Sequence, residues 1–290
     1  MARDALNDFA IVNGANLYFE RQGQGPPVLF IAGSTGDAGN FTRTANLLAD
    51  EFTVVTYDRR GNSRSPRPPG WTTTSVSEQA DDAAALIQAL GLGPTVVFGA
   101  SAGGLIALDL IIRHPQILSA GILQEPSIFS VLPDPTVALA PRRAVLEDAL
   151  RTHGPRGAIE ALMRYLNDDG IAAAIPPDVL ERMLSNADTI LAIEGPGFAG
   201  WQPRTEDLKR LKIPVTLLVA SQTLPVYKQV THWLAQQLDT EPIAVPGRHA
   251  FYCYHPQDLA HVLRPIVRRA QFPGENRGQT TELHPSSEAR

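Results

Sequence analysis

The sequence predicts an α/β protein: a mostly parallel, twisted sheet flanked by helices, with an inserted helical cap. Short apolar runs alternate with helical patterns over most of the chain, which is typical of a parallel sheet with covering helices. Residues 99–103 (Gly-Ala-Ser-Ala-Gly) stand between an apolar run and a helical pattern, as in a strand that turns sharply into a helix. From about residue 126 to 206 the strand pattern stops, and the chain becomes helical and rich in proline.

The strands are expected where β-branched, aromatic and aliphatic residues form short runs. These runs cover residues 9–12, 17–20, 28–31, 52–57, 95–98, 120–123, 215–219 and 243–245. Between the fourth and fifth runs, Ser75 and Glu78 form a capping box that opens a helix, and Gly91 closes it. Further core helices are expected to start near Pro225 and Pro256.

The change of pattern divides the chain into a core and an insertion. Residues 1–125 and 207–270 are predicted to form the core, and residues 126–206 the cap, with helical patterns at 142–150, 157–166 and 177–186. Residues 271–290 contain Gly, Pro, Ser and Glu but almost no apolar anchor, so we expect a disordered tail.

Composition and charge restrict the partners. The chain has 290 residues, of which 43% are hydrophobic, and a formal net charge of −5. This charge offers no attraction to nucleic acid or to an anionic membrane surface, and no apolar run approaches the roughly 18 residues of a membrane span. The first residues lack the apolar stretch of a secretory signal. We expect a cytoplasmic protein, monomeric or homodimeric, that acts on a small molecule without a metal or other cofactor.

Ser101, at the centre of the 99–103 turn, is the candidate nucleophile. A strand that reverses tightly into a helix strains the central residue and leaves no room for side chains beside it, which explains Gly99 and Gly103. The serine hydroxyl is then exposed above the sheet, at the positive end of the following helix. The alternative is a turn of small residues that only lets the helix pack closely on its strand. Cys253 is the single cysteine, and its aromatic neighbours favour a small buried apolar residue over a nucleophile.

A serine hydroxyl needs a base, and the base needs a group that orients it. Among seven histidines, His249 is favoured because it follows the last predicted strand and precedes the last helix, where open α/β sheets place their sites. His255, at the entry of that helix, is the rival.

The sequence gives an unusual answer for the acid. No Asp or Glu occurs from 213 to 238, and the loop after the strand at 215–219 offers only Thr223. Glu125, which directly follows the preceding strand, is therefore the predicted acid, because its longer side chain could reach His249 from the neighbouring loop. Two alternatives stay open: a Ser-His dyad, or recruitment of Asp58, which we interpret instead as holding the loop at 59–61.

Acyl transfer also requires donors for an oxyanion. The N–H of Ala102, at the helix start, is one candidate, and that of Ser34, in the glycine-containing loop 32–36, is the other. A merely flexible glycine turn is the alternative for this loop.

Over residues 9–270 the chain resembles the α/β-hydrolase superfamily. The resemblance is carried by the 99–103 turn, the segment Tyr-Asp-Arg-Arg-Gly-Asn-Ser at 57–63, the cap and the loop 247–249. The acid after the strand that precedes the cap is similar to that of fungal zearalenone lactonases, as are the segments 124–126, 220–225 and 246–249. That resemblance implies a Ser101–Glu125–His249 triad acting on a macrocyclic resorcylic lactone. Two features depart from that family: the loop Gly-Ser-Thr-Gly at 33–36 and the cap.

Residues expected to touch the substrate lie in two segments. Gly33 belongs to the oxyanion loop, and Phe198 and Trp201 belong to the stretch 197–203. Trp201 could correspond to a ligand-contacting lid tryptophan of the family or could be core of the cap.

The sequence as a whole predicts a cofactor-free hydrolase of a small apolar carboxylic ester or lactone. His249 would deprotonate Ser101, and the acyl-enzyme would then be cleared by water. The alternatives are a carbon–carbon or thioester hydrolase with the same triad, and a ligand receptor that uses the fold without turnover.

Overall fold

The computed structural model describes residues 6–271, so the tail predicted for 271–290 lies almost wholly outside the described residues. Each of the eight predicted strands is present, and together they form one sheet. The strands are β1 (Leu6–Val12), β2 (Ala15–Gln22), β3 (Pro27–Ile31), β4 (Thr53–Tyr57), β5 (Thr95–Ala100), β6 (Leu118–Gln124), β7 (Val215–Ala220) and β8 (Ile243–Val245).

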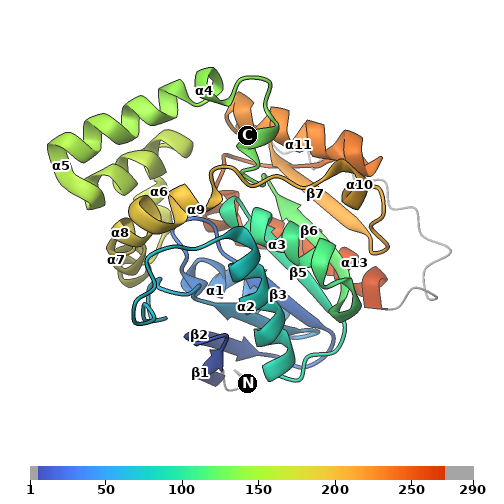
Figure 1. The fold of residues 1–290 in the computed structure, drawn as a ribbon. Coiled ribbons are helices and arrows are strands. Elements are labelled where there is room, and N and C mark those ends of the chain that lie inside the picture. The colour runs from blue at the N-terminus through green and yellow to red at the C-terminus, as the bar shows by residue number, and fades with distance from the viewer. Residues whose placement is uncertain (1–5, 272–290) are drawn as a thin grey trace, which may run out of the picture.

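The strand order in the sheet is β1-β2-β4-β3-β5-β6-β7-β8 (Figure 1). β1 and β2 pair antiparallel, as do β2 and β4, whereas every pairing from β4 through β3, β5, β6 and β7 to β8 is parallel. The carboxyl ends of the parallel strands therefore meet at one edge, where open α/β sheets place their sites. The loops after β3, β5, β6, β7 and β8 all open there.

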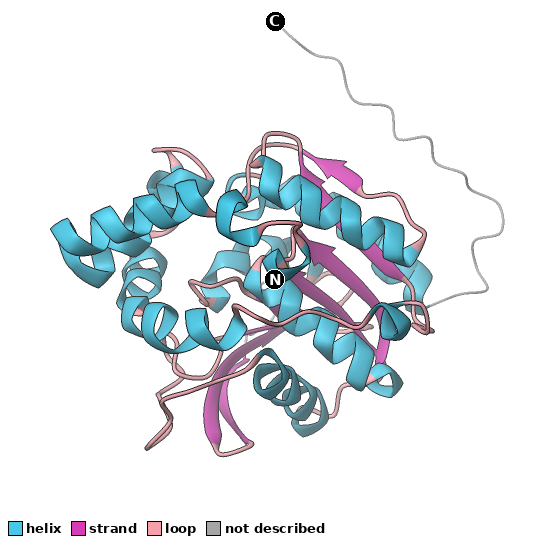
Figure 2. Ribbon diagram, turned by 45° about the horizontal axis from the view of Figure 1, so that its top comes forward, coloured by secondary structure: helices cyan, strands magenta, loops and turns pink. Residues whose placement is uncertain are grey.

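Helices cover both faces of the sheet (Figure 2). Successive strand side chains point to opposite faces: Val28 and Phe30 belong to the cluster that includes residues of α1 (Thr42–Leu48) and α13 (Pro256–Gln271). Leu29 and Ile31 belong to the opposite cluster, with α2 (Val76–Ala89), α3 (Ala102–Arg113) and α11 (Pro225–Leu238). Shorter core elements are η1 (Ala38–Phe41), η2 (Pro115–Ile117) and α12 (Phe251–Tyr254).

The helix ends follow the expected local chemistry. Ser75 caps α2, since its side chain accepts the Glu78 N–H at 3.0 Å. Gly91, just beyond the helix, has a φ of 61°. The starts of α11 and α13 at Pro225 and Pro256 agree with the prediction.

The segment between β6 and β7 consists of helices and connecting loops and contains no strand. It comprises η3 (Phe129–Val131), α4 (Pro135–Ala138), α5 (Ala140–Leu166), α6 (Ile171–Ala174), α7 (Pro177–Ser185), α8 (Ala187–Thr189), η4 (Ile190–Glu194), α9 (Gly195–Phe198) and α10 (Thr205–Leu208). The two helical patterns predicted at 142–150 and 157–166 are present as two helices, which the label α5 covers together. They are separated by a kink at Gly154, whose φ of 69° and ψ of −172° are not helical.

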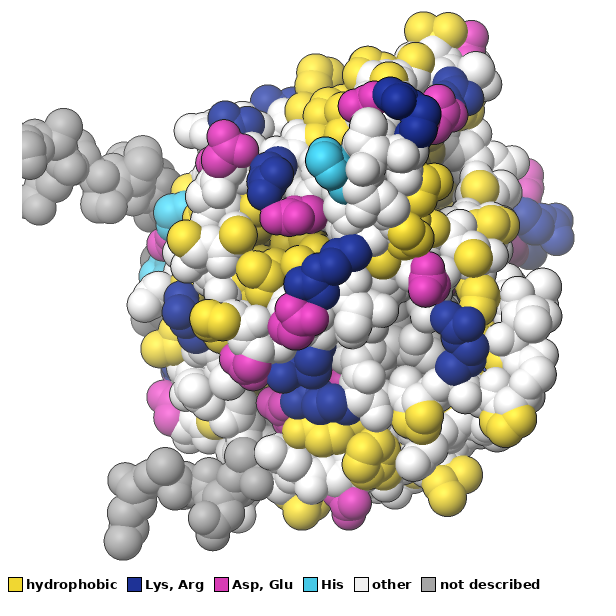
Figure 3. Space-filling view, turned by 90° about the vertical axis from the view of Figure 1, so that its left-hand side faces the viewer, with side chains coloured by type: hydrophobic (Ala, Val, Ile, Leu, Met, Phe, Trp, Pro, Cys, Tyr) yellow, Lys and Arg dark blue, Asp and Glu magenta, His cyan; other side chains and the backbone are white. Residues whose placement is uncertain are grey.

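The face of the molecule that carries this cap shows acidic and basic side chains interspersed with hydrophobic ones (Figure 3). Among the described helices, none combines the length and apolar character that crossing a bilayer requires.

Candidate active site

Ser101 stands at the apex of the turn between β5 and α3, with φ 55° and ψ −119°. This positive φ is strained for a residue with a side chain. A Cβ at Gly103 would lie 2.2 Å from the carbonyl oxygen of Ile31, and one at Gly99 would lie 2.4 Å from that of Gly103. Strand and helix therefore approach so closely that glycine is required on both sides of the serine.

Glu125 and His249 are in direct contact. The Nδ1 of His249 lies 2.5 Å from Oε2 of Glu125, and both side chains are buried. The same carboxylate accepts the Ala220 N–H at 2.7 Å and the Thr223 hydroxyl at 2.8 Å. A carboxylate held by donors acts as an acceptor, so Nδ1 carries the proton and Nε2 keeps its lone pair. This Nε2 is buried and has no hydrogen-bond partner within residues 6–271.

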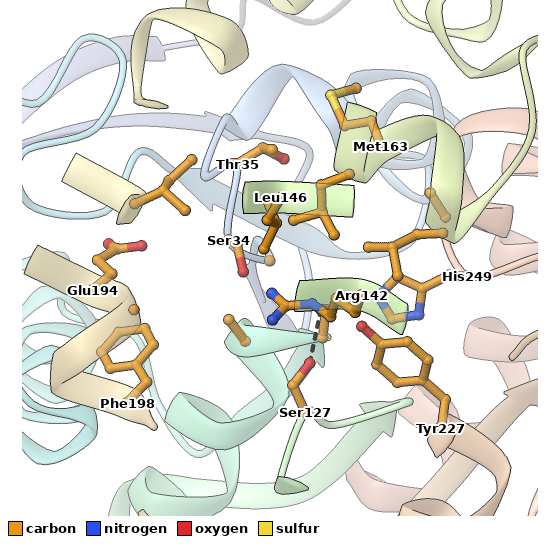
Figure 4. Close-up of a pocket in the computed structure, with 18 of the residues that line it drawn as sticks. Ser34, Thr35, Ser127, Arg142, Leu146, Met163, Glu194, Phe198, Tyr227 and His249 are labelled. Atoms are coloured by element: carbon orange, nitrogen blue, oxygen red, sulfur yellow. Dashed lines mark hydrogen bonds between the residues drawn. The ribbon is translucent and has the colours of Figure 1, made fainter. Parts of the chain in front are cut away.

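The hydroxyl of Ser101 is engaged elsewhere. Its Oγ lies 3.0 Å from Oγ of Ser127, which follows Glu125 by two residues (Figure 4). Tyr227, at the start of α11, stacks its ring on His249 with centroids 4.0 Å apart. Burial raises the pKa of Tyr227, against smaller opposing effects that include hydrogen bonds with Ser127 and Ser101, so the phenol stays protonated. In this structure Oγ of Ser101 therefore contacts the Ser127 hydroxyl, and Nε2 of His249 stays without a partner among the described residues.

Both predicted oxyanion donors belong to residues that line the cavity beside Ser101. Ala102 occupies the first position of α3, where helical amides have no intrahelical acceptor, and Ser34 lies in the loop after β3. A Cβ at Gly33 would lie 3.1 Å from Cβ of Ser101, so this loop passes directly beside the nucleophile. Arg59 fixes the loop from behind by donating to the carbonyls of Gly33 and Ser34 at 2.9 and 3.2 Å.

The site opens into a cavity of about 540 Å³ between the core and the cap. Ser101, His249, Ala102, Gly33 and Ser34 all line it. Figure 4 shows Ser34 and His249 among the side chains around the cavity. The cap supplies a mostly apolar wall: Leu139, Leu146, Leu162, Met163, Ile171, Ile190 and Phe198.

Phe198 therefore lies where the sequence placed it, but Trp201 does not. Trp201 does not line the cavity. It is partly buried and packs against the hydrophobic cluster that includes residues of α3 and α11. Its carbonyl accepts the Ser130 hydroxyl at 2.7 Å. Of the two alternatives for Trp201, the structure gives the packing role.

The other candidates for the acid, the base and the nucleophile each have a feature that does not suit the role. Asp58 is buried away from the cavity, where it accepts the Ala38 N–H and pairs with Arg64, so it holds the loop that follows it. The side chain of His255 is 41% exposed and lies near Asp258. Cys253 borders the cavity, but burial raises the pKa of its thiol to about 12.

Among the cavity residues that the sequence analysis did not predict are Ser127, Tyr227 and Arg142. Ser127 follows Glu125 by two residues, and Tyr227 follows Pro225 by two. Their closeness in sequence to the carboxyl ends of β6 and β7 was the signal that could have placed them at the site. Arg142 carried no signal, because nothing local distinguishes it from the other arginines of α5.

The comparisons with known proteins agree with this architecture. Residues 26–155 match the family model described as alpha/beta hydrolase fold. An uncharacterized hydrolase of Bacillus subtilis (strain 168), YraK, is 33% identical over 264 residues, which are 89% of this chain and 94% of the relative.

Two solved structures share the fold. The esterase of Thermogutta terrifontis is 24% identical with a TM-score of 0.71, and the match covers 92% of this chain and 99% of that one. The enol-lactonase of Burkholderia xenovorans LB400 is 18% identical with a TM-score of 0.70, covering 89% and 99%. The sheet, the strained serine turn and the extent of the match to YraK together show that the chain belongs to the α/β-hydrolase fold family.

Proposed function

We propose that the chain is a serine hydrolase that cleaves carboxylic esters through an acyl-enzyme at Ser101. One observation carries the proposal. The Glu125–His249 pair leaves a buried, unpartnered Nε2 in the wall of the cavity that also contains the Ser101 hydroxyl. A histidine with a fixed tautomer and a free basic nitrogen beside a strained serine is what a general base for acyl transfer requires.

The reaction follows from these positions. Nε2 of His249 takes the proton as Oγ of Ser101 attacks the ester carbonyl, and Glu125 stabilises the resulting imidazolium. The N–H groups of Ala102 and Ser34 bind the oxyanion. The imidazolium then protonates the leaving alcohol. Water, deprotonated by His249, cleaves the acyl-enzyme and restores the serine. For a lactone, alcohol and acid stay joined, so a single hydroxy acid leaves.

Lactones are the subclass that we propose first, zearalenone-like macrolactones among them. The support is the acid after β6, which resembles that of the zearalenone lactonases, and the mostly apolar cavity of about 540 Å³. Cavities of roughly 300–1,000 Å³ hold drug-sized ligands. The fold shared with an esterase and an enol-lactonase agrees with ester chemistry.

The test is turnover on a panel of p-nitrophenyl esters, small lactones, zearalenone, an acyl thioester and a vinylogous diketone. We expect hydrolysis of esters or lactones that is lost in Ser101→Ala and in His249→Ala. His255→Ala, which removes an exposed histidine outside the cavity, is the matched control and keeps activity. If only the thioester or only the diketone were turned over, ester hydrolysis would be wrong, and the protein would be a thioester hydrolase or a carbon–carbon hydrolase. Ligand binding without turnover would indicate a receptor.

A further inference from the structure

The charges on the cavity wall do not balance. Of the described residues that line the cavity, Arg142 is the one basic side chain besides His249, and Glu194 is the one carboxylate. Glu194 is already paired. Its carboxylate accepts hydrogen bonds from both terminal nitrogens of the buried Arg59 and from the side-chain amides of Asn62 and Gln79. The positive charge of Arg142 is left over.

Arg142 also differs from every other arginine of α5. Arg143 donates to the carbonyl of Thr136, and the remaining three pair with carboxylates: Arg151 with Asp148, Arg156 with Glu181, and Arg164 with Glu160. Arg142 forms no ion pair within the described chain, and its Nε is buried without a hydrogen-bond partner. Its guanidinium lies over the ring of Phe129, whose centroid is 5.8 Å from Cζ.

The guanidinium is close to the reacting groups. Arg142 lines the same cavity as Ser101 and His249, and in Figure 4 its guanidinium points into that cavity. Its charge opposes the burial effect on the pKa of Tyr227, whose hydroxyl bonds to Ser127 and Ser101. A partly buried guanidinium in an apolar cavity is costly unless an anion meets it. Carboxylates match its planar fork with two parallel hydrogen bonds.

We propose that the substrate carries a carboxylate in addition to the ester, and that Arg142 binds this carboxylate. The inference rests on the proposed ester hydrolysis and departs from the zearalenone-like lactones named above, which carry no free carboxylate. A dicarboxylic hemiester or an acid-bearing lactone is preferred over a neutral ester of the same shape. Leu139, Leu146 and Phe198 would contact the apolar part of that molecule.

Matched pairs of esters test the charge alone. p-Nitrophenyl hydrogen glutarate and its methyl ester place the carboxylate, or its neutral equivalent, on the acyl side. 4-Acetoxybenzoic acid and its methyl ester place it on the alcohol side. kcat and KM are measured for all four with the unmodified protein, Arg142→Gln, Arg142→Lys and Arg143→Gln. The last removes an equal charge from the exposed face of α5.

For the unmodified protein we expect higher kcat/KM on the acid of at least one pair, and the responsive pair identifies the side that faces Arg142. Arg142→Gln should lower kcat/KM on that acid by about 10- to 100-fold, mainly through KM, because a hydrogen bond to a charged group is lost. The neutral partner should change by less than about threefold, and Arg142→Lys should recover part of the loss. Arg143→Gln should behave as the unmodified protein.

Other results overturn the proposal. If Arg142→Gln lowered kcat/KM equally on the acid and the neutral ester, Arg142 would act on the reaction itself and would not bind a carboxylate. If the unmodified protein showed no preference within either pair, the substrate would need no carboxylate. Both outcomes leave ester hydrolysis intact. If none of the four esters is hydrolysed, ester hydrolysis fails separately. Calorimetric binding of N-phenylglutaramic acid and its methyl ester then decides: tighter binding of the acid that is lost in Arg142→Gln supports the carboxylate site, and equal binding refutes it.

Discussion

The hydroxyl of Thr223 donates to Oε2 of Glu125 at 2.8 Å, and that same oxygen lies 2.5 Å from Nδ1 of His249. Thr223 occupies the loop after β7, where the sequence led us to look for an acid. The loop contributes a donor instead, and a carboxylate from the neighbouring strand end reaches into it. Thr223 is thus a positioning residue that fixes the carboxylate against the histidine.

Replacing Thr223 tests this positioning role. Thr223→Val keeps the shape but removes the donor, and we expect kcat to fall by about tenfold, the value of one hydrogen bond to a charged group. KM should change little, the urea midpoint should fall because the buried carboxylate loses a donor in the folded protein, and Thr223→Ser, which keeps a hydroxyl, should restore most of kcat. Equal losses in the Val and Ser variants, or a loss confined to stability, would show that Thr223 is only packing.

Gly33 is expected to be intolerant of a side chain. In Gly33→Ala the new Cβ would lie 3.1 Å from Cβ of Ser101 and 3.3 Å from the carbonyl oxygen of Ala100, so the oxyanion loop and the serine must separate. Because acyl transfer is sensitive to small displacements, kcat should fall by at least about tenfold. Gly93→Ala is the control, since its Cβ meets nothing within 4 Å. Matching kcat values for the two variants would contradict this placement of the loop.

Glu194 should join the cap to the oxyanion loop. It belongs to η4 and pairs with Arg59, which holds the carbonyls of Gly33 and Ser34. Glu194→Gln leaves the buried Arg59 without a counter-charge, a change that costs about 3–5 kcal/mol in buried pairs. We expect a lower urea midpoint and a lower kcat together.

The control for Glu194 is Glu181→Gln, which breaks an exposed pair with Arg156 and should leave the urea midpoint and kcat unchanged. If Glu194→Gln resembled this control, the Arg59–Glu194 pair would not couple the cap to the site.

Cys253 should be unreactive although it borders the cavity. Burial raises the pKa of its thiol to about 12. Because pH 8 is far below this pKa, the thiol stays protonated at pH 8. The thiolate is the nucleophile, so Ellman's reagent should label the native protein slowly at pH 8 and the urea-unfolded protein rapidly. Cys253→Ala should keep most of kcat. Rapid labelling of the native protein, with loss of activity in Cys253→Ala, would reopen the cysteine as a nucleophile.

The strands and the serine turn were predictable because their signals are local. A run such as 28–31 or 95–98 is apolar enough to be a buried parallel strand, and only glycine fits beside Ser101 at so close a strand–helix approach. The placement of Glu125 was also readable, since the absence of any Asp or Glu from 213 to 238 points to another strand end.

The cap was not predictable at the same level. Which side chains of α5 face the cavity depends on how that helix packs over the core, and Arg142 looks in sequence like Arg143 beside it. Trp201 shows the same limit: a tryptophan near a lid suggests a ligand contact, yet its packing places it away from the cavity. By contrast, the separation of α5 into two helices at Gly154 was readable from the sequence, because that signal is local.

The most direct test of the triad is the rate at which a fluorophosphonate labels Ser101, followed by intact-protein mass spectrometry and mapped by proteolysis. In the unmodified protein Oγ of Ser101 should displace fluoride from phosphorus, and Ser101→Ala should remain unlabelled. Glu125→Gln can present an amide donor to Nδ1 and so protonate the wrong nitrogen of His249, slowing labelling by about 10²–10⁴-fold. Labelling of Glu125→Gln at the unmodified rate, or at a residue other than Ser101, would contradict the account.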